Sequence, residues 1–430
     1  VCSSDLRVTT DQDMGEQLTS QLLGDSRSLM MTGAIIGAIG LVPGMPHVAF
    51  LLLAGGLGGM GYLAQKRKQA LSSPPAPVAS EAPADNTDVG WSEVTPVDVL
   101  GLEVGYRLIP LVDKGRDGDL LKRIKAIRRK FAQEVGFLPP SIHIRDNLEL
   151  KPGAYRVTLK GVEIASHEAN PGMYLAINPG GVTARLQGVT TTDPAFGLPA
   201  VWIDAGDRDH ALAEGYTVVD ASTVIATHLS QLVHTHAGEL LGRTELQQLF
   251  DHLAKETPKL TEELTPKLLP LSTVQRVLQN LLDEGVHIRD MRTIIDVLTV
   301  HAARTQDSEE LTALTRIALG RAIAQGLFPG GAQMQVMSLA PNLERLLMQA
   351  ASSDSSVIEP ELAATLVNET RNAAQRHEQL GVPPVLVVPG RIRTLLARFL
   401  RRQVAQLKVL SHSEVPDSRD VKIISVVGES

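Results

Sequence analysis

The sequence holds a single cysteine, Cys2, in 430 residues. One cysteine cannot form an internal disulfide, and no pair of cysteines is available to hold zinc. Aromatic residues make up only 3% of the chain, so the stacking side chains on which single-stranded nucleic acids bind are scarce. The formal net charge of −7 also opposes a protein that neutralises phosphates. Disulfide-stabilised, zinc-binding and general nucleic-acid-binding classes are therefore disfavoured.

The motifs of phosphate-binding and hydrolytic enzymes are missing as well. No G-x-x-x-x-G-K-[ST], G-x-S-x-G or H-E-x-x-H occurs. His228, His234 and His236 are spaced by six and two residues, which places them on different faces of a helix. Metal ligands on one helix are spaced by three or four residues, so we interpret these histidines as solvated or capping residues. No catalytic residue, metal site or cofactor is predicted.

A glycine-rich stretch over residues 55–61, GGLGGMG, contains an apparent G-x-G-x-x-G. This fingerprint binds dinucleotides only where it follows a strand, opens a helix and is followed by an acidic residue about 20 positions later. Here it lies inside an apolar run that ends in the basic cluster 66–68. The small-xxx-small spacing of Gly55 and Gly59 indicates close packing between helices instead.

Two apolar runs, 29–42 and 47–64, are almost free of charge and are separated by Pro-Gly-Met-Pro at 43–46. The tandem predicts a transmembrane helical hairpin over residues 28–65, although each run is shorter than the roughly 20 residues of a comfortable span. The basic cluster that follows places residues 1–27 and the segment after the hairpin in the cytoplasm. A buried hairpin in a soluble scaffold is the alternative. Because the chain begins with Val, we interpret it as a fragment without its true N-terminus.

Residues 66–98 are rich in Pro, Ala and Ser and predict a flexible linker. From residue 99 the pattern becomes that of a folded protein with helices and short strands. Residues 106–112 resemble a strand, and residues 119–135 carry apolar side chains at helical spacing. Alternation predicts strands at 141–144 and 155–164. Short strands rich in Gly and Thr follow up to residue 219.

The second half of the chain is first helical and then mixed. Asp220 is predicted to cap a helix over 222–238, and residues 244–325 are predicted to be nearly all helical. Thr244 is predicted to precede one helix and Ser272 to cap another, and two more helices are predicted to start at Asp290 and Ser308. From Met334 an α/β sandwich with helices on one side is expected. Its predicted strands are 334–338, 385–388, 407–410 and 421–427, and its predicted helices are 341–350, 360–379 and 391–405.

Two of the predicted helices carry dense basic charge, around residues 122–130 and 391–402. A nucleic-acid surface would need base-reading or stacking side chains beside that charge. We interpret both segments as solvated helix faces, with subunit contacts as the alternative. No nucleic-acid partner is predicted.

Several longer motifs resemble those of one known family. They are 40–46 (GLVPGMP), 193–203 (DPAFGLPAVWI), 239–243 (ELLGR), 277–282 (VLQNLL), 288–294 (IRDMRTI), 319–321 (LGR) and 397–402 (ARFLRR). From about Arg7 to the C-terminus the chain is similar to the FHIPEP family, the export-gate proteins of type III secretion. The flagellar branch is favoured over the injectisome branch.

The resemblance implies an α+β region of four subdomains in the cytoplasm, preceded by the last two transmembrane spans. The expected limits are 99–171 with 221–240 for subdomain 1, 172–220 for the inserted subdomain 2, 241–320 for the helical subdomain 3, 321–419 for the α/β subdomain 4, and 420–430 for a C-terminal strand and tail. It also implies a nonameric ring at the bacterial inner membrane that couples export to the proton gradient. The expected partners are flagellar export chaperones with cargo, other export-gate membrane proteins and the export ATPase complex.

The family's chaperone-docking depression corresponds to Asp193, Phe196 and Thr227, with Ile177, Pro179 and Val219 nearby. An exposed Phe in an apolar depression suits an anchor, and a neighbouring carboxylate would add orientation. In the alternative, Phe196 packs inside subdomain 2 and Asp193 caps a turn. Gly105 is expected to be a conformational hinge. A membrane-tethered enzyme with subdomain 2 as a lid is the competing function, and the absence of a catalytic motif favours a non-enzymatic receptor.

Overall fold

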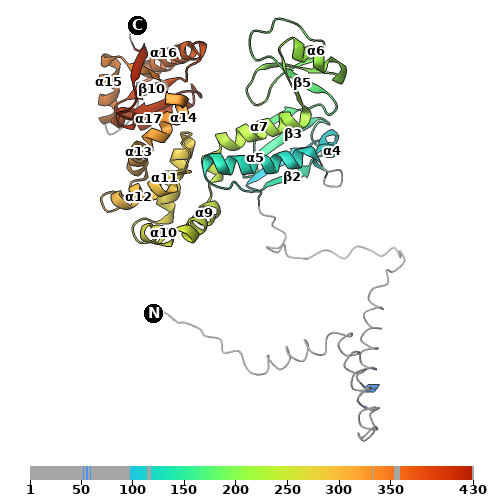
Figure 1. Ribbon diagram of the computed structural model, residues 1–430, viewed down its shortest axis with the longest axis horizontal. Coiled ribbons are helices and arrows are strands. Elements are labelled where there is room, and N and C mark those ends of the chain that lie inside the picture. The colour runs from blue at the N-terminus through green and yellow to red at the C-terminus, as the bar shows by residue number, and fades with distance from the viewer. Residues whose placement is uncertain are drawn as a thin grey trace, which may run out of the picture. The chain divides into compact units, whose positions relative to one another are not determined.

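The computed structural model divides the chain into two units, Val1–Glu93 and Val94–Ser430. The described residues are 52, 55, 56, 59, 97–113, 118–331, 333–352 and 359–428. The predicted hairpin and linker therefore lie almost entirely outside them. Within the described part of the chain, no helix combines the length and apolar character needed to cross a bilayer. The elements of the second unit are labelled in Figure 1, and we keep the names subdomains 1 to 4 for the limits given above.

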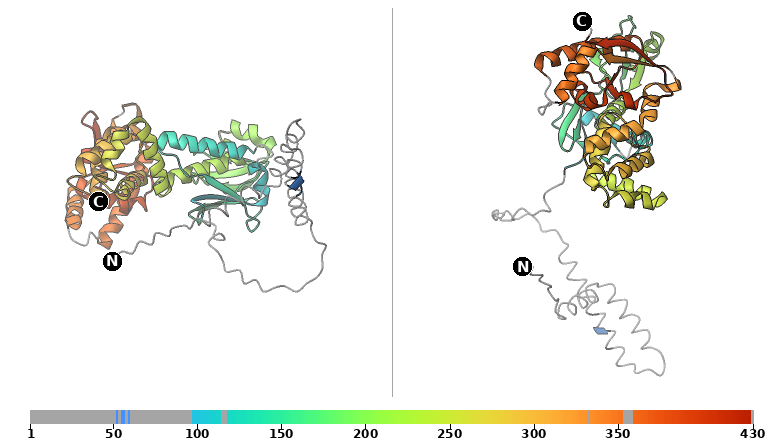
Figure 2. Two further views of the ribbon diagram at one scale, coloured as in Figure 1. Left: turned by 90° about the horizontal axis from the view of Figure 1, so that it is seen from below. Right: turned by 90° about the vertical axis from the view of Figure 1, so that its left-hand side faces the viewer.

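Subdomain 1 is built on a four-stranded sheet in the order β2-β1-β3-β4. The strands are β1 (Leu100–Val104), β2 (Ile142–Asp146), β3 (Ala154–Leu159) and β4 (Val162–Glu168). β1 runs parallel to β2 and antiparallel to β3. The helices α5 (Asp119–Val135) and α7 (Ala221–Thr235) lie side by side over the sheet (Figure 1; Figure 2, left). Tyr155, Val157 and Leu159 alternate along β3 and are buried, as expected of a strand with one face on the core.

The strand predicted at 106–112 is wrong. The chain forms the short 3-10 helix η2 (Tyr106–Leu108) and then α4 (Ile109–Val112). Pro110 explains the difference, because proline has no N–H for a sheet ladder and fits the first turn of a helix. The strand of this region is β1, which ends immediately before Gly105.

Subdomain 2 contains a second sheet in the order β6-β7-β5-β8. Its elements are β5 (Tyr174–Ile177), β6 (Val189–Thr192), β7 (Pro199–Ile203), η4 (Ala205–Asp207), α6 (Arg208–Ala213) and β8 (Thr217–Asp220). One face of this sheet, including Leu175 and Trp202, belongs to the hydrophobic core of subdomain 1. The other face, including Ala176 and Ile203, forms a small cluster with α6. One face of the sheet of the inserted subdomain is therefore part of the core of subdomain 1.

The helical segment follows the predicted pattern in outline. Its helices are α8 (Ala237–Leu240), α9 (Arg243–Glu256), α10 (Pro258–Leu264), α11 (Leu271–Asp283), α12 (Met291–His301), α13 (Ser308–Ala318) and α14 (Gly320–Leu327). The cap predicted at Asp220 is confirmed, and the helix predicted to start at Asp290 is capped by that residue, since each carboxylate accepts a hydrogen bond from a backbone N–H in the first turn. The predictions that Thr244 precedes a helix and that Ser272 caps one are wrong, because both residues lie inside helices that begin at Arg243 and Leu271. α9 and α11 follow Gly242 and Pro270, which are extended and make no side-chain cap.

Subdomain 4 has a parallel sheet in the order β11-β10-β9-β12. Its elements are η5 (Pro329–Gly331), β9 (Met334–Leu339), α15 (Pro341–Ser352), α16 (Pro360–Gln379), β10 (Val385–Val388), α17 (Gly390–Arg401), β11 (Lys408–Ser411) and η6 (His412–Glu414). The strand expected beyond residue 419, β12 (Val421–Val427), pairs with β9 and completes this sheet. One face packs on α15, α16 and α17, and the other face packs on Ala324 and Phe328 at α14. The prediction of helices on one side alone is therefore wrong, because a parallel sheet of continuous apolar strands requires cover on both faces.

Candidate functional site

A tight turn joins β6 to β7 and carries Phe196 near its tip. The backbone N–H of Asp193 donates to the Leu198 carbonyl at 2.8 Å, and the N–H of Gly197 donates to the Asp193 carbonyl at 2.8 Å. The Asp193 carboxylate accepts a hydrogen bond from the Phe196 N–H, also at 2.8 Å. Gly197 has a φ of 70°, a conformation that glycine adopts at little cost. Three hydrogen bonds thus fix the conformation of the turn.

Two residues of this turn differ strongly in the exposure of their side chains. The Phe196 side chain is 66% exposed, whereas Asp193 is only 3% exposed. The alternative in which Phe196 packs inside subdomain 2 is therefore wrong. For Asp193 the geometry favours the turn-capping role, because its buried carboxylate bonds the turn rather than facing outward. A direct orienting contact between this carboxylate and a partner does not fit that burial.

The other predicted site residues lie on neighbouring elements. Ile177 on β5 and Val219 on β8 are half-buried and pack against the core of subdomain 1. Pro179 is exposed just beyond β5. Because Ile177 pairs with Ala200 at the start of β7, Pro179 lies at the same end of the sheet as the turn that bears Phe196.

Thr227 is half-buried on α7, the helix of subdomain 1 that contacts β5. The structure thus places Ile177 and Val219 at the junction of subdomains 1 and 2, and Thr227 on the helix that borders this junction. Phe196 and Pro179 are exposed at the end of the sheet that forms one side of this junction.

Sequence reasoning missed a buried polar pair beneath this surface. The hydroxyl of Tyr155 on β3 lies 2.8 Å from Nδ1 of His228 on α7, and both residues are buried. Burial lowers the pKa of His228, His167 lowers it further, and the Asp193 carboxylate acts in the opposite direction. Burial together with Asp193 raises the pKa of Tyr155. Asp193 therefore couples the turn electrostatically to the Tyr155–His228 pair.

The interpretation of His228 as a solvated or capping histidine is wrong. Helical spacing offers a signal for its burial, since Val224, Ile225 and Leu229 on the same helix face are also buried. His234 and His236 do accord with local roles. Nδ1 of His234 lies 2.8 Å from the Ser230 carbonyl, and Nδ1 of His236 lies 2.9 Å from the Glu239 carboxylate. No group of three or more His, Cys, Asp or Glu side chains that could hold a metal occurs in the described part of the chain.

Gly105, the predicted hinge, lies where β1 ends against the 151–154 segment. Its N–H donates to the Ala154 carbonyl at 2.8 Å. A β-carbon at this position would collide with the Lys151 carbonyl oxygen and would lie 2.8 Å from that of Pro152. Its φ of −69° is open to any residue, so the close backbone approach is what requires glycine here.

A second group of residues, which the sequence analysis did not predict, joins subdomains 3 and 4. Arg316 on α13 has a side chain only 3% exposed, and its Nη1 lies 2.8 Å from a carboxylate oxygen of Glu284. Its Nε donates to the Glu414 carboxylate at 3.1 Å. Arg393 on α17 pairs with the same two carboxylates. Two arginines and two glutamates from separate elements thus form a buried ionic network, which we call the Arg316 network.

Comparison with known proteins places the chain among its relatives. The model of the FHIPEP family matches residues 6–420. The chain is 51% identical over 422 residues to the flagellar biosynthesis protein FlhA of Escherichia coli (strain K12), and 49% identical over 422 residues to that of Salmonella typhimurium. Each match covers 98% of this chain and 61% of the relative, so the chain spans about three-fifths of the relatives' length.

Solved structures share the fold of the second unit. The CdsV protein of Chlamydia pneumoniae superposes with a TM-score of 0.69 at 22% identity, and the nonameric EPEC SctV-C with 0.63 at 22%. Each match covers 78% of this chain and 99% of the solved chain. The expected α+β architecture is confirmed. With a family match over nearly its whole length and close relatives of the same kind, the chain belongs to the FHIPEP family.

Proposed function

We propose that this chain is part of the export gate of a flagellar type III secretion system and acts as a receptor rather than an enzyme. In this proposal the second unit docks export chaperones with their cargo and passes the cargo to a proton-driven channel. Family membership and 51% identity to a flagellar biosynthesis protein support it. The flagellar branch is preferred because the injectisome-type solved structures are only 20–23% identical.

The exposed Phe196 carries the docking proposal. A large aromatic side chain that is 66% exposed on a hydrogen-bonded turn is costly to leave in water and loses little entropy when it is covered. Exposed Pro179 and half-buried Ile177, Val219 and Thr227 provide apolar surface at the adjoining junction. We assign Phe196 as the anchor and these four residues as its surroundings. Asp193 acts indirectly by holding the turn.

The test is a calorimetric titration of residues 94–430 with a cargo-loaded flagellar export chaperone. Phe196→Ala should cost about 2 kcal/mol or more of docking free energy. Its melting temperature should stay unchanged, because the side chain contributes little to the core. Leu380→Ala is a matched control, since Leu380 is 67% exposed at the end of α16. If the Phe196→Ala variant docks the chaperone with wild-type affinity, the assignment of Phe196 as the anchor is wrong.

A second variant tests whether the chaperone contacts the junction as well as the turn that bears Phe196. Thr227→Met adds bulk on α7 at the junction, and we expect it to reduce docking with a small effect on stability. The reduction should persist in the Phe196→Ala background if the chaperone covers both positions. If Thr227→Met docks normally, the contact is confined to the turn.

The ring, further partners and membrane location also belong to this proposal. Solved structures of the nonameric SctV-C and of the nonameric EscV cytosolic domain support a homo-oligomeric ring. A CdsV–CdsO complex supports additional partners, for which the export ATPase complex and other gate proteins are the candidates. The apolar runs within 28–65 support location in the inner membrane. Mass photometry with and without residues 66–98 tests the ring. Identical oligomer distributions would contradict a role of that segment in assembly.

A further inference from the structure

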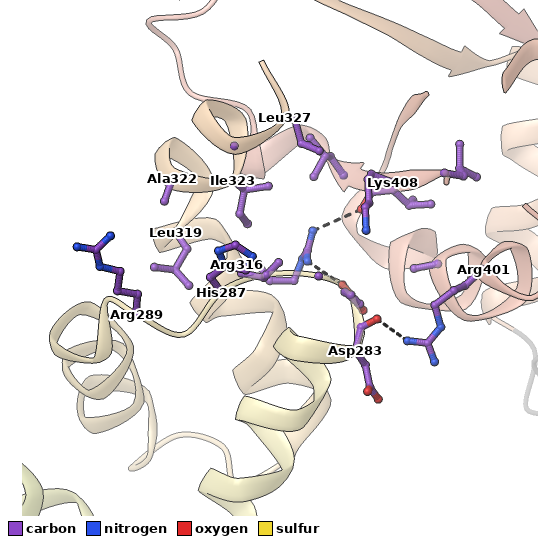
Figure 3. A pocket seen from close by; sticks show the side chains of 18 of the residues that line it. Asp283, His287, Arg289, Arg316, Leu319, Ala322, Ile323, Leu327, Arg401 and Lys408 are labelled. Carbon is purple, nitrogen blue, oxygen red and sulfur yellow. Dashed lines mark hydrogen bonds and ion pairs between the residues drawn. The ribbon is translucent and has the colours of Figure 1, made fainter. Parts of the chain in front are cut away.

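A cavity of about 600 Å³ opens where subdomain 3 meets subdomain 4 (Figure 3). Its walls come from the segment after α11, from α13 and α14, from the end of α17 and from β11. The residues on which the argument rests are Asp283, Arg316, Ile323, Gly326, Arg401 and Lys408. A volume of this size is typical of sites for small organic molecules.

One wall of the cavity is an apolar helix face. Leu319, Ala322, Ile323 and Leu327 line it at the three- and four-residue spacing of one side of a helix (Figure 3). Gly326 lies on the same face, and a β-carbon there would meet no atom within 4 Å. This side of the cavity is therefore suited to an aliphatic chain.

The opposite wall carries cations. Lys408 begins β11 and Arg401 ends α17 (Figure 3). Arg401 donates one hydrogen bond, at 2.6 Å, to the backbone carbonyl of Asp283. Within the described residues, the side chain of Lys408 has neither a hydrogen bond nor an ion pair. Burial lowers the pKa of Lys408, and Arg316 and Arg401 lower it further, while Glu284 acts against them. This half-buried ammonium group is therefore without a directly paired carboxylate, and Glu284 is the one acidic group that favours its charged form.

Four carboxylates line the cavity, and within the described residues none of them pairs with Lys408. Glu134 lies 3.8 Å from Lys130 and 3.5 Å from His234. Glu284 is paired with Arg316 and Arg393 in the Arg316 network. Asp290 accepts hydrogen bonds from Thr293 at the start of α12. Burial raises the pKa of Asp283, which disfavours its charged form. An anion from outside the chain would therefore be stabilised here.

We propose that this cavity is a binding site for an amphiphilic carboxylate, whose carboxylate contacts Lys408 and Arg401 and whose aliphatic chain lies along α14. Such a ligand would bridge subdomains 3 and 4 and strengthen their attachment. The carboxylate could belong to a free fatty-acid-like molecule or to the apolar C-terminus of a peptide. This site is separate from the docking surface at Phe196, and neither proposal depends on the other.

The test is a calorimetric titration of residues 94–430 with decanoate, with thermal melts in parallel. We expect saturable binding and a rise in melting temperature. Decanol should bind at least about tenfold more weakly, because a charged hydrogen bond is lost. A tri-leucine peptide with a free C-terminus, and its C-terminal amide, distinguish the sources. Tighter binding of the free peptide than of decanoate indicates a peptide terminus, and the reverse order indicates a free amphiphile.

Variants of the two walls make the test specific. Lys408→Gln should weaken decanoate binding about tenfold, whereas Arg402→Gln, a neighbouring exposed charge outside the cavity, should leave it unchanged. Gly326→Leu should abolish binding by filling the cavity without lowering the melting temperature. Phe196→Ala should bind decanoate normally. If neither decanoate nor the free tri-leucine peptide binds saturably in the millimolar range, the proposal is wrong. It is also wrong if the Gly326→Leu variant binds decanoate as wild type does.

Discussion

The two junctions of the second unit are held together by different kinds of interaction. Subdomain 2 meets subdomain 1 through an apolar sheet face that belongs to the same core, and it presents Phe196 outward. Subdomain 4 has hydrophobic clusters of its own and meets subdomain 3 through the Arg316 network. Apolar contact is non-directional and is lost gradually, whereas buried charges must keep their partners. We therefore expect the first junction to tolerate change and the second to fail abruptly.

Breaking the Arg316 network should give the largest effect on stability. Arg316→Met leaves the buried carboxylates of Glu284 and Glu414 with one arginine between them, and should cost about 3–5 kcal/mol in the free energy of unfolding. Urea denaturation of residues 94–430 measures this. Arg398→Met is the control, because its pair with Glu309 is exposed and should be worth about 0–1 kcal/mol. Equal effects of the two variants would contradict the special role of the buried network.

The substitution Gly105→Ala, in subdomain 1, should reduce stability by an intermediate amount. The added methyl group has to displace the carbonyls of Lys151 and Pro152, which costs about 1–3 kcal/mol. Thermal unfolding measures the loss, with Gly206→Ala as the control, since a β-carbon at Gly206 meets no atom within 4 Å. If both substitutions are equally mild, the backbone approach does not require glycine.

Removing the Tyr155 hydroxyl should have a smaller effect. Tyr155→Phe leaves Nδ1 of buried His228 without its partner, and we expect a loss of about 1 kcal/mol in the free energy of unfolding. A larger loss, near that of Arg316→Met, would mean that the first junction also depends on polar contacts. Tyr106→Phe is the control, because Tyr106 is 54% exposed.

The smallest expected effect is a dependence of stability on pH. The pKa of His228 lies below its ordinary value of 6.5, since burial and His167 disfavour the charged form more than Asp193 favours it. Below about pH 6.5 the unfolded chain takes up a proton that the native chain resists, so the free energy of unfolding falls as the pH falls. Burial lowers the pKa of His287 and His377 too, with the same sign. The free energy of unfolding, measured by denaturation between pH 7.5 and 5.5, should fall less for His228→Gln than for wild type.

The sequence predicted those elements whose signals are local. The predicted strands at 385–388 and 421–427 agree with β10 and β12 residue for residue, because each is rich in Val and Ile and has a clear boundary. The strand predicted at 106–112 failed because Pro110 outweighed its apolar neighbours. Contacts between residues far apart in the chain have no such local signal in the sequence. Arg316 and Glu414 are 98 residues apart, and the pairing of Tyr155 with His228 spans 73 residues. The Arg316 network and the cavity beside it could therefore not be read from spacing.

Hydrogen exchange of residues 94–430, measured with and without a cargo-loaded flagellar export chaperone, tests the central claim most directly. Amide protection reports which surface the partner covers. We expect increased protection in the turn between β6 and β7, at the end of β5 and in the first half of α7, and no change at the 283–290 segment or β11. Protection confined to the 283–290 segment and β11, with none around Phe196, would contradict the account.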